Sequence, residues 1–400
     1  MTGLGSPTTR PRNRRQQILA AAAQRFHTSG YHNVSMTDIA DAIGITAAAL
    51  YRHFRGKQDL LLATVRDAID QVSEVVGQTF GGIDEMLGAL ATSSMQSRDA
   101  GILWEREMAH LPADLRHELR ARLLHAVAPL RAAIGHARPT LPPDDLDVLL
   151  WAVLAVFVST GYHTVTPPSE RFRERLLEAA HAVCQTTALP QHLSGAFRRA
   201  GKPAGLLPVS RREAVLTAAM RLYSEHGYQA VGVDEIGAAA GITGPSVYHH
   251  FSGKNAILTT ALARCLEAMF FDLSGALYAA ESYGDALDRV LRSYVRTSTE
   301  HGEPIGGLFN EIVSLPIAEQ DAILKVQRDY LAEWVALLIG HRPALTVDEA
   351  RVLVHAAVTV INSLMRIRHL RRRPALEREL VELGRAVLGL GAQAEVQDRS

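Results

Sequence analysis

The sequence predicts an all-α protein made of two tandem copies of one helical unit. Apolar residues recur along the chain at the spacing of one helix face. Shifting the numbering by 197 aligns residues 14–61 with residues 211–258 without a gap, and about nineteen of the 48 aligned pairs are identical. Further along the chain, an offset of 204 aligns the Leu-Pro pair at 111–112 with the Leu-Pro pair at 315–316. Self-similarity of this length indicates a duplication.

Each copy begins with a pattern of three short helices. In the first copy, apolar residues 18–26 lie along one helix face, and Gly30 is expected to close that helix in a left-handed conformation. Ser35 and Asp38 form a capping box that opens a second helix, which stops at Gly44. A third helix follows directly. Two short helices joined by a tight glycine turn predict a helix-turn-helix, whose second helix can enter the DNA major groove.

The residue types at the predicted third helix suit DNA contact. Its first residues are small, so that the backbone can approach base edges, and polar side chains follow them. The expected DNA-contacting residues of the first copy are Thr37, Thr46, Ala47, Ala48, Ala49, Tyr51, Arg52, His53 and Lys57. Those of the second copy are Asp234, Thr243, Gly244, Pro245, Ser246, Tyr248, His249, His250 and Lys254. Lys57 stands near the start of the next helix, where a phosphate is favoured.

These motifs resemble the DNA-binding domain of the TetR/AcrR family of transcriptional regulators. The residues that carry the resemblance in the first copy are Ile39, Ala40, Gly44, Ile45, Leu50, Tyr51, His53, Phe54, Lys57 and Leu60. The resemblance implies that a helical ligand-binding and dimerising domain follows each helix-turn-helix. Two such units in one chain depart from the usual family arrangement.

The expected organisation follows from the duplication and from a Gly- and Pro-rich boundary in the middle of the chain. The expected domains are an N-terminal arm with the first helix-turn-helix at 1–58, a first helical regulatory domain at 59–190, a linker with a basic arm at 191–210, a second helix-turn-helix at 211–255, a second helical regulatory domain at 256–392 and a tail at 393–400. The arginines at 10–15 are expected to form an arm that is disordered off DNA. Such an arm can enter the minor groove, and the equal alternative is an ordinary soluble tail.

The charge distribution supports a nucleic-acid partner although the net charge is zero. Residues 10–57 carry eight Lys and Arg against two Asp and Glu, a balance of +6. Residues 198–254 carry seven against four, a balance of +3. Basic charge is therefore concentrated where contact with a double-stranded DNA operator is predicted.

The two copies differ at DNA-facing positions. Thr37 is replaced by Asp234, which would repel phosphate or accept a hydrogen bond from cytosine. Arg52 is replaced by His249. We therefore expect the first copy to bind DNA more tightly and the two copies to recognise unequal half-sites.

The resemblance also implies self-association through the last two helices of each regulatory domain. The matching segments are 144–163, 168–187, 346–370 and 373–391. Residues 148–158 are apolar around the whole helix, so burial on several sides is expected. We favour an intramolecular pseudo-dimer with one helix-turn-helix per half-site, about 34 Å apart. The alternative is a homodimer with four DNA-binding heads.

The resemblance to the family further implies a repressor that a small, largely apolar effector releases from DNA. Residues that fit an apolar pocket with a few polar anchors are Trp104, Trp151, Phe157, Tyr162, Phe309, Trp334, His355 and Asn362. Aromatic residues at helical spacing more often belong to an ordinary core. The sequence does not indicate the identity of the effector.

Other classes of function are less well supported. Glu107 with His110, and Glu178 with His181, have the spacing of bundle metal ligands, but the second copy has neither pair. No phosphate-binding glycine loop or nucleophile motif is present, so no enzyme, cofactor or metal is predicted. The two widely separated cysteines and the lack of a long apolar run favour a cytoplasmic protein. The remaining alternative is a helical interaction module that has lost DNA binding.

Overall fold

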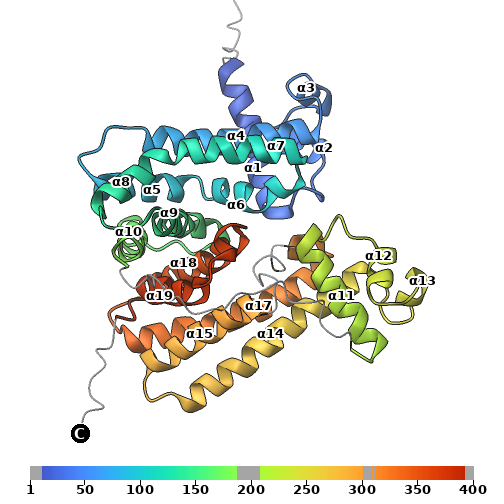
Figure 1. Cartoon of the computed structure of the whole chain (residues 1–400). Helices are drawn as coiled ribbons and strands as arrows, with labels where there is room; N and C mark the ends of the chain where they lie inside the picture. The colour runs from blue at the N-terminus through green and yellow to red at the C-terminus, as the bar shows by residue number, and fades with distance from the viewer. Residues whose placement is uncertain (1–10, 187–207, 301–308, 310, 392–400) are drawn as a thin grey trace, which may run out of the picture. The chain divides into compact units, whose positions relative to one another are not determined.

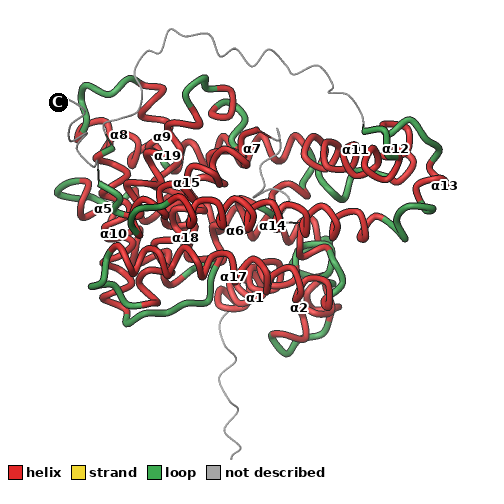
Figure 2. The backbone as a smooth tube through the Cα atoms, turned by 90° about the horizontal axis from the view of Figure 1, so that it is seen from below, coloured by secondary structure: helices red, strands yellow, loops and turns green. Residues whose placement is uncertain are grey.

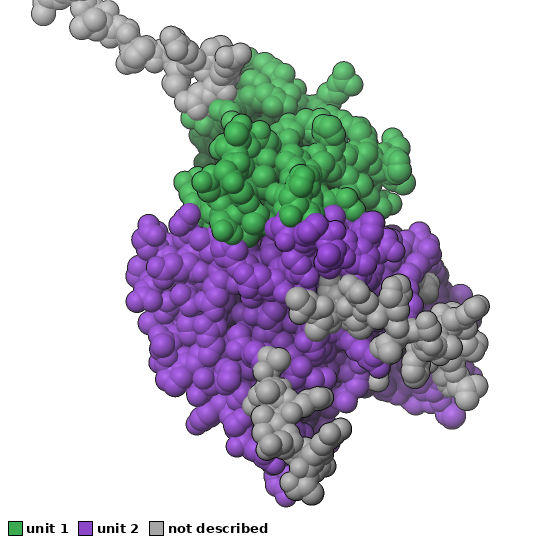
Figure 3. All heavy atoms as spheres, turned by 60° about the vertical axis from the view of Figure 1, so that its left-hand side comes forward, with its two compact units in different colours: residues 1–136 green, residues 137–400 purple. Residues whose placement is uncertain are grey.

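The structure, a computed structural model, describes residues 11–186, 208–300, 309 and 311–391. All elements in these ranges are α-helices or short 3-10 helices (Figures 1 and 2). The chain divides into two compact units, Met1–His136 and Ala137–Ser400 (Figure 3). The prediction of an all-α fold is confirmed. The bounds of the six predicted domains stay a prediction.

Unit 1 contains the first helix-turn-helix and the helices that follow it. Its elements are α1 (Pro11–Ser29), α2 (Met36–Ala42), α3 (Ala47–Tyr51), α4 (Lys57–Val76), α5 (Ile83–Gln96), α6 (Asp99–Glu105), η1 (Glu107–His110), α7 (Ala113–Ala126) and α8 (Ala128–Ala137). The central helix is α4, which packs against α1, α5, α6 and α7. It buries Leu60, Leu61 and Val65 on the faces that these helices cover.

The local signals of the first helix-turn-helix act as the sequence predicts. Gly30 has φ of 77° and donates its N–H to the carbonyl of Phe26 at 2.9 Å, which closes α1. Ser35 and Asp38 form the complete capping box of α2. Gly44 has φ of 66° in the turn between α2 and α3. A side chain at either glycine would strain the backbone.

The prediction of a disordered basic arm at the N-terminus is wrong for its last residues. Helix α1 begins at Pro11, so Arg14 and Arg15 belong to a helix rather than to an arm. Proline at the first helical position has no N–H to leave unpaired, and its fixed φ suits a helix start. Residues 1–10 lie outside the described residues.

Unit 2 contains the end of the first repeat and the described part of the second. Its elements are α9 (Pro143–Val158), η2 (Ser159–Tyr162), α10 (Ser169–Gln185), α11 (Arg211–His226), α12 (Val233–Ala239), α13 (Gly244–Val247), α14 (Lys254–Ala279), α15 (Tyr283–Glu300), η3 (Glu311–Ser314), α17 (Ile317–His341), α18 (Val347–Arg366), η4 (Leu370–Arg372) and α19 (Leu376–Leu388). The second helix-turn-helix packs through α11 on α14, and α14 continues into contacts with α15 and α17.

Four helices from the two repeats pack together inside unit 2. They are α9 and α10 from the first repeat and α18 and α19 from the second, and α18 contacts each of the other three. The expected burial around α9 is confirmed, with residues such as Val148, Val153 and Val156 fully buried. Among the described residues, the segment Pro143–Tyr162 alone has the length and apolar content to cross a membrane, but 78% of its apolar window is buried in the structure, as in a core helix.

Ion pairs link the repeats in a pseudo-symmetric way. Asp145 near the start of α9 pairs with Arg373, which precedes α19. Glu349 near the start of α18 pairs with Arg171 of α10 at 3.5 Å. Positions 145 and 349 are related by the offset of 204. An interface in which the same patch of each repeat meets the other repeat has the form of a two-fold dimer interface.

A side chain before the bundle also repeats its contacts at the offset of 204. In both repeats it joins the 3-10 helix and the loop after it to the next long helix. Arg116 donates to the carbonyls of Ala109 and Leu111, and Gln320 donates to those of Val313 and Leu315. The duplication therefore extends into the regulatory helices, where sequence identity is low.

Candidate nucleic-acid interface

In the first head (α1–α3), polar side chains cover the exposed side of the third helix. Thr46 caps α3 by accepting the N–H of Ala49 at 3.2 Å. Leu50 is fully buried and anchors the helix, whereas Tyr51 beside it is 54% exposed. The predicted contact residues Thr37, Thr46, Ala48, Tyr51, Arg52 and His53 are exposed, and Ala47, Ala49 and Lys57 are half-buried. The head thus presents small and polar groups over an apolar anchor.

The second head (α11–α13) has the same plan with different packing. Gly241 takes φ of 70° in its turn, Val247 is the buried anchor and Tyr248 is 58% exposed. A Cβ atom at Gly237 would lie 2.9 Å from the amide nitrogen of Gly244, so the backbones of α12 and α13 approach too closely for a side chain there. The first head has alanine at both corresponding positions.

The predicted contact residues of the second head are also mostly exposed. Asp234, Thr243, Pro245, Tyr248 and His249 are exposed, Ser246, His250 and Lys254 are half-buried, and Gly244 is buried. The Asp234 carboxylate folds against Gly244, where a Cβ atom would lie within 1.7 Å of it. Its charge therefore lies at the start of α13, the helix proposed to face DNA.

The two lysines predicted to contact phosphate point back into their own heads. Lys57 Nζ donates to the carbonyl of Val34 at 2.8 Å and of His32 at 3.3 Å, and it lies 4.4 Å from the centre of the Tyr31 ring. Burial lowers the pKa of Lys57. Two of its three N–H donors are therefore used to hold the loop before α2, and one remains for a phosphate.

Lys254 repeats this arrangement with one hydrogen bond fewer. Its ammonium donates to the carbonyl of Gln229 at 3.3 Å and lies 4.2 Å from the centre of the Tyr228 ring. Burial lowers its pKa as well. The phosphate role of both lysines stays a prediction.

The structure places Arg15, which the sequence analysis assigned to a minor-groove arm, and Arg212, which it did not assign, against aromatic rings of the two heads. The guanidinium of Arg15 lies 5.5 Å from the centre of the Phe54 ring, and that of Arg212 lies 4.6 Å from the Phe251 ring. These cation–π contacts hold a positive charge on the first helix of each head. The available signal was the Arg-Arg pair that is identical in both copies, at 14–15 and 211–212.

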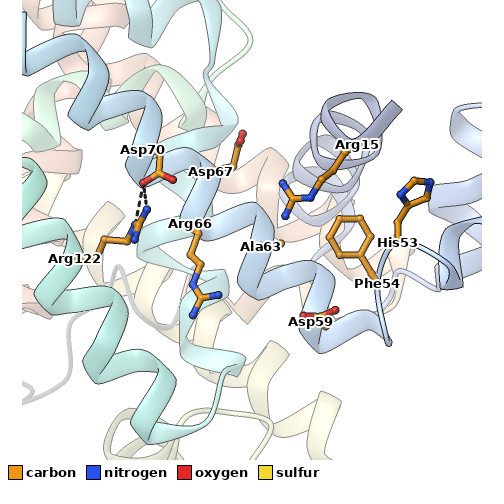
Figure 4. A pocket seen from close by; sticks show the side chains of 9 residues that line it. All are labelled: Arg15, His53, Phe54, Asp59, Ala63, Arg66, Asp67, Asp70 and Arg122. Atoms are coloured by element: carbon orange, nitrogen blue, oxygen red, sulfur yellow. Dashed lines mark hydrogen bonds and ion pairs between the residues drawn. The ribbon is translucent and has the colours of Figure 1, made fainter. Parts of the chain in front are cut away.

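Unit 1 also has a polar hollow of about 340 Å³ beside the first head (Figure 4). Arg122 crosses one side of it and donates to Asp70 at 2.6 and 2.9 Å. The hollow is lined by Arg15, His53, Phe54, Asp59, Ala63, Arg66, Asp67, Asp70 and Arg122. Its charged walls differ from the largely apolar effector pocket that the sequence suggested.

The predicted pocket residues of the first repeat lie in two units. Trp104 is half-buried on α6 of unit 1, whereas Trp151 and Phe157 are buried on α9 of unit 2. Tyr162 accepts a hydrogen bond from Arg366 of α18 at 3.3 Å. Trp151 and Phe157 thus belong to the buried surface of α9.

Two predicted pocket residues of the second repeat come together around Tyr294 of α15. The Tyr294 hydroxyl donates to Asn362 at 3.0 Å, and its ring meets the fully buried Trp334 edge-on at 5.7 Å. His355 lies elsewhere, 4.8 Å from the ring of His163 in the first repeat. Phe309 is a half-buried residue between segments outside the described residues. An effector pocket at these positions stays a prediction.

The acidic residues considered as metal ligands are engaged with arginines. Glu178 pairs with Arg175 and with Arg342, and Glu107 pairs with Arg106. Among the described residues, no three His, Cys, Asp or Glu side chains converge in a way that would hold a metal ion.

Comparison with known proteins identifies the class of these two heads. The sequence profile of the family described as bacterial regulatory proteins, tetR family, matches residues 18–64 and 215–261, which are the two helix-turn-helix regions. Two regions of the chain, in tandem, therefore match the helix-turn-helix domain of the tetR family.

Individual relatives match parts of the chain. The transcriptional activator FasR of Mycolicibacterium smegmatis is 41% identical over 65 residues, which are 16% of this chain and 30% of FasR. The transcriptional repressor AcnR of Corynebacterium glutamicum is 26% identical over 162 residues, 38% of this chain and 82% of AcnR. The structure of KstR2 of Mycobacterium tuberculosis has a TM-score of 0.38 at 21% identity and covers 46% of this chain and 94% of its own. These relatives are transcriptional regulators.

Proposed function

We propose that this chain is a sequence-specific DNA-binding transcriptional regulator that acts in the cytoplasm, with two DNA-binding heads of its own. The observation that carries the proposal is the pair of tetR-family helix-turn-helix domains, each with an exposed tyrosine and polar neighbours on its third helix. Basic residues around both heads would neutralise DNA phosphates and release counterions, so binding should weaken steeply with salt.

We propose further that one chain occupies one operator as an intramolecular pseudo-dimer. This is supported by the packing of α9 and α10 with α18 and α19 inside unit 2. It is also supported by the two related ion pairs of Asp145 and Glu349. Because these four helices already cover one another within one chain, a second chain is not required to bury their apolar surfaces.

The two heads should recognise unlike half-sites. Thr37 of the first head corresponds to Asp234 of the second, and Arg52 corresponds to His249. A carboxylate near DNA disfavours phosphate and accepts from the amino group of cytosine. We therefore expect an operator with one tightly bound half-site and one weaker, cytosine-containing half-site.

Regulation is proposed to be repression that a small effector relieves. The names of AcnR and KstR2 as repressors support this direction, whereas FasR is named an activator. The group formed by Tyr294, Trp334 and Asn362 offers a polar anchor among aromatic rings and is our preferred effector region. The effector would favour a conformation in which the distance between the two heads no longer fits the operator.

Selection of duplexes from a random pool by the full chain tests the proposal. We expect enrichment of a bipartite site whose two half-sites differ in sequence, with binding that falls steeply between low and moderate salt. Enrichment of a perfect palindrome would contradict unequal heads. The absence of any enriched duplex at low salt would favour the helical interaction module instead.

A further inference from the structure

A buried ion pair joins the first head to the helices that follow it within unit 1. Glu107 of η1 is fully buried and accepts the backbone N–H of Tyr31 at 2.9 Å. Its other oxygen pairs with Arg106. Arg106 in turn donates to the carbonyls of Phe26 and His27, both at 2.7 Å. Both carbonyls belong to the last turn of α1, where backbone acceptors run out of helical donors, and that of Phe26 also accepts the N–H of Gly30.

The ion pair acts on the loop that leads to the DNA-facing helices. We call residues 31–34 the junction loop. Glu107 holds its first amide, and Lys57 holds the carbonyls of His32 and Val34. The loop ends at Ser35, the cap of α2, and α2 packs against α3. The position of both DNA-facing helices is therefore tied to Glu107 through four residues.

The second repeat preserves only part of this arrangement. Glu311 corresponds to Glu107, but Asn310 stands where the first repeat has Arg106. His32 contacts His110 at 3.1 Å, whereas the corresponding Gln229 donates to Ser314 at 3.0 Å. The contact between the second head and η3 is thus retained. Position 310, however, has no guanidinium that could donate to the carbonyls at the end of α11.

We propose that Arg106 and Glu107 are positioning residues that couple the regulatory helices of the first repeat to the DNA-facing helices of the first head, and that the second head lacks this coupling. The inference rests on the proposed function and deepens it, because it assigns the regulatory response to one of the two heads. A movement of α6 and η1 would shift the junction loop through Glu107 and displace α2 and α3. A buried charged pair transmits such a shift because neither partner can be left alone in the interior.

Coupling between two sites is reciprocal. If η1 affects DNA binding at the first head, DNA bound there must therefore change the stability of η1. Amide hydrogen exchange of the full chain, with and without a duplex that the wild-type chain selects from a random pool, measures this. We expect bound DNA to slow exchange in residues 106–111 by about five- to tenfold, within the usual range of coupling. Exchange in residues 311–315 of the second repeat should change less than about twofold.

Two variants test the named residues. Arg106→Asn installs the residue that the second repeat has at position 310, and Glu107→Gln keeps an acceptor for the Tyr31 amide but removes the ion pair. Glu311→Gln is the matched control. In both first-repeat variants, DNA should still slow exchange in the heads but no longer in residues 106–111. A purely structural role would lower the melting temperature without removing this response.

The outcomes separate the two hypotheses. If the wild-type chain selects no duplex, the proposed function fails. If it binds DNA and exchange in residues 106–111 does not change, or if Glu311→Gln abolishes the response as fully as Glu107→Gln, the coupling is wrong. If Glu107→Gln does not fold, Arg106→Asn decides, because the second repeat already accommodates asparagine there.

Discussion

The two repeats share a backbone plan but differ in how each head is fixed to the rest of its repeat. In the first, a buried carboxylate and a histidine pair contact the junction loop, and a guanidinium binds the end of α1 beside it. In the second, Gln229 donates to Ser314, whose hydroxyl donates to the carboxylate of Glu311 at 3.4 Å. The second repeat thus keeps the carboxylate, but it has Asn310 in place of Arg106 and no histidine pair. The two repeats thus share one plan, but different side chains fix their heads.

The largest expected effect concerns the two pseudo-symmetric ion pairs of the bundle. Arg373 lies between Asp145 and Glu379, which are 8% and 1% exposed, so Arg373→Met leaves two buried carboxylates without their cation. We expect a loss of about 3–5 kcal/mol in the free energy of unfolding of the bundle. Urea unfolding followed by Trp151 fluorescence measures it.

The matched control is Arg171→Met on the other side of the bundle. Arg171 is 60% exposed and Glu349 keeps its bonds to Thr346, so the loss should stay below about 1 kcal/mol. Equal losses from the two variants would show that the two halves of the interface are energetically alike.

The next effect is a pH dependence of stability that His110 contributes beside the junction loop of the first repeat. Burial, together with His32, Arg106 and Lys57, lowers the pKa of His110 to about 4 from 6.5. The unfolded chain therefore binds the proton more readily, and stability is lost as the pH falls below 6.5 towards 4. Between pH 7 and pH 5 the loss should be about 2 kcal/mol.

His110→Ser, which installs the residue found at position 314, should remove this loss. Unfolding followed through Trp104, which lies on α6, reports on unit 1 at each pH. Burial lowers the pKa of His355 to about 4 as well, so the stability of the variant will still depend on pH. The test is therefore the difference between the pH dependence of the variant and that of the wild type. An unchanged pH dependence in the variant would exclude His110 as its source.

The third effect concerns the two inward-pointing lysines. Lys57 donates hydrogen bonds to two backbone carbonyls of the junction loop, whereas Lys254 donates to one carbonyl in the corresponding loop. We expect Lys57→Met to weaken DNA binding about tenfold, or about 1.4 kcal/mol, and Lys254→Met about threefold. Fluorescence anisotropy at fixed salt compares them on the selected duplex. Equal losses would contradict the unequal heads.

The smallest effect concerns the caps of the second helix in each head. Ser35 caps α2 with its side chain, whereas Gly232 at the start of α12 has none. Ser35→Ala should lower the stability of the first head by about 1 kcal/mol, and Gly232→Ser should raise that of the second by a few tenths. Thermal unfolding of each variant measures both. A gain from Gly232→Ser larger than the loss from Ser35→Ala would mean that the caps do not distinguish the heads.

The sequence predicted the features that depend on neighbouring residues. The capping box of Ser35, the glycine turns and the burial of the apolar helix α9 each follow from a local pattern. The internal repeat also indicated which distant segments correspond. The bundle segments were predicted from the family resemblance, and in unit 2 those helices pack together.

Features that depend on tertiary contact were not predictable in the same way. Glu107 has the spacing of a bundle metal ligand from His110, which lies 3.7 Å from it, but its carboxylate accepts hydrogen bonds from Arg106 and from an amide 76 residues away. Lys57 was expected to reach outward, and the Tyr31 ring and two carbonyls turn it inward. No local pattern records which backbone atoms a long side chain will meet.

The mass of the specific protein–DNA complex tests most directly the claim that one chain is a complete pair of unequal heads. The full chain is mixed with its selected duplex at moderate salt, and the complex is weighed by native mass spectrometry or light scattering. We predict one chain per duplex, with both unlike half-sites protected in a footprint. Two chains per duplex, with only one half-site contacted by each, would contradict the account.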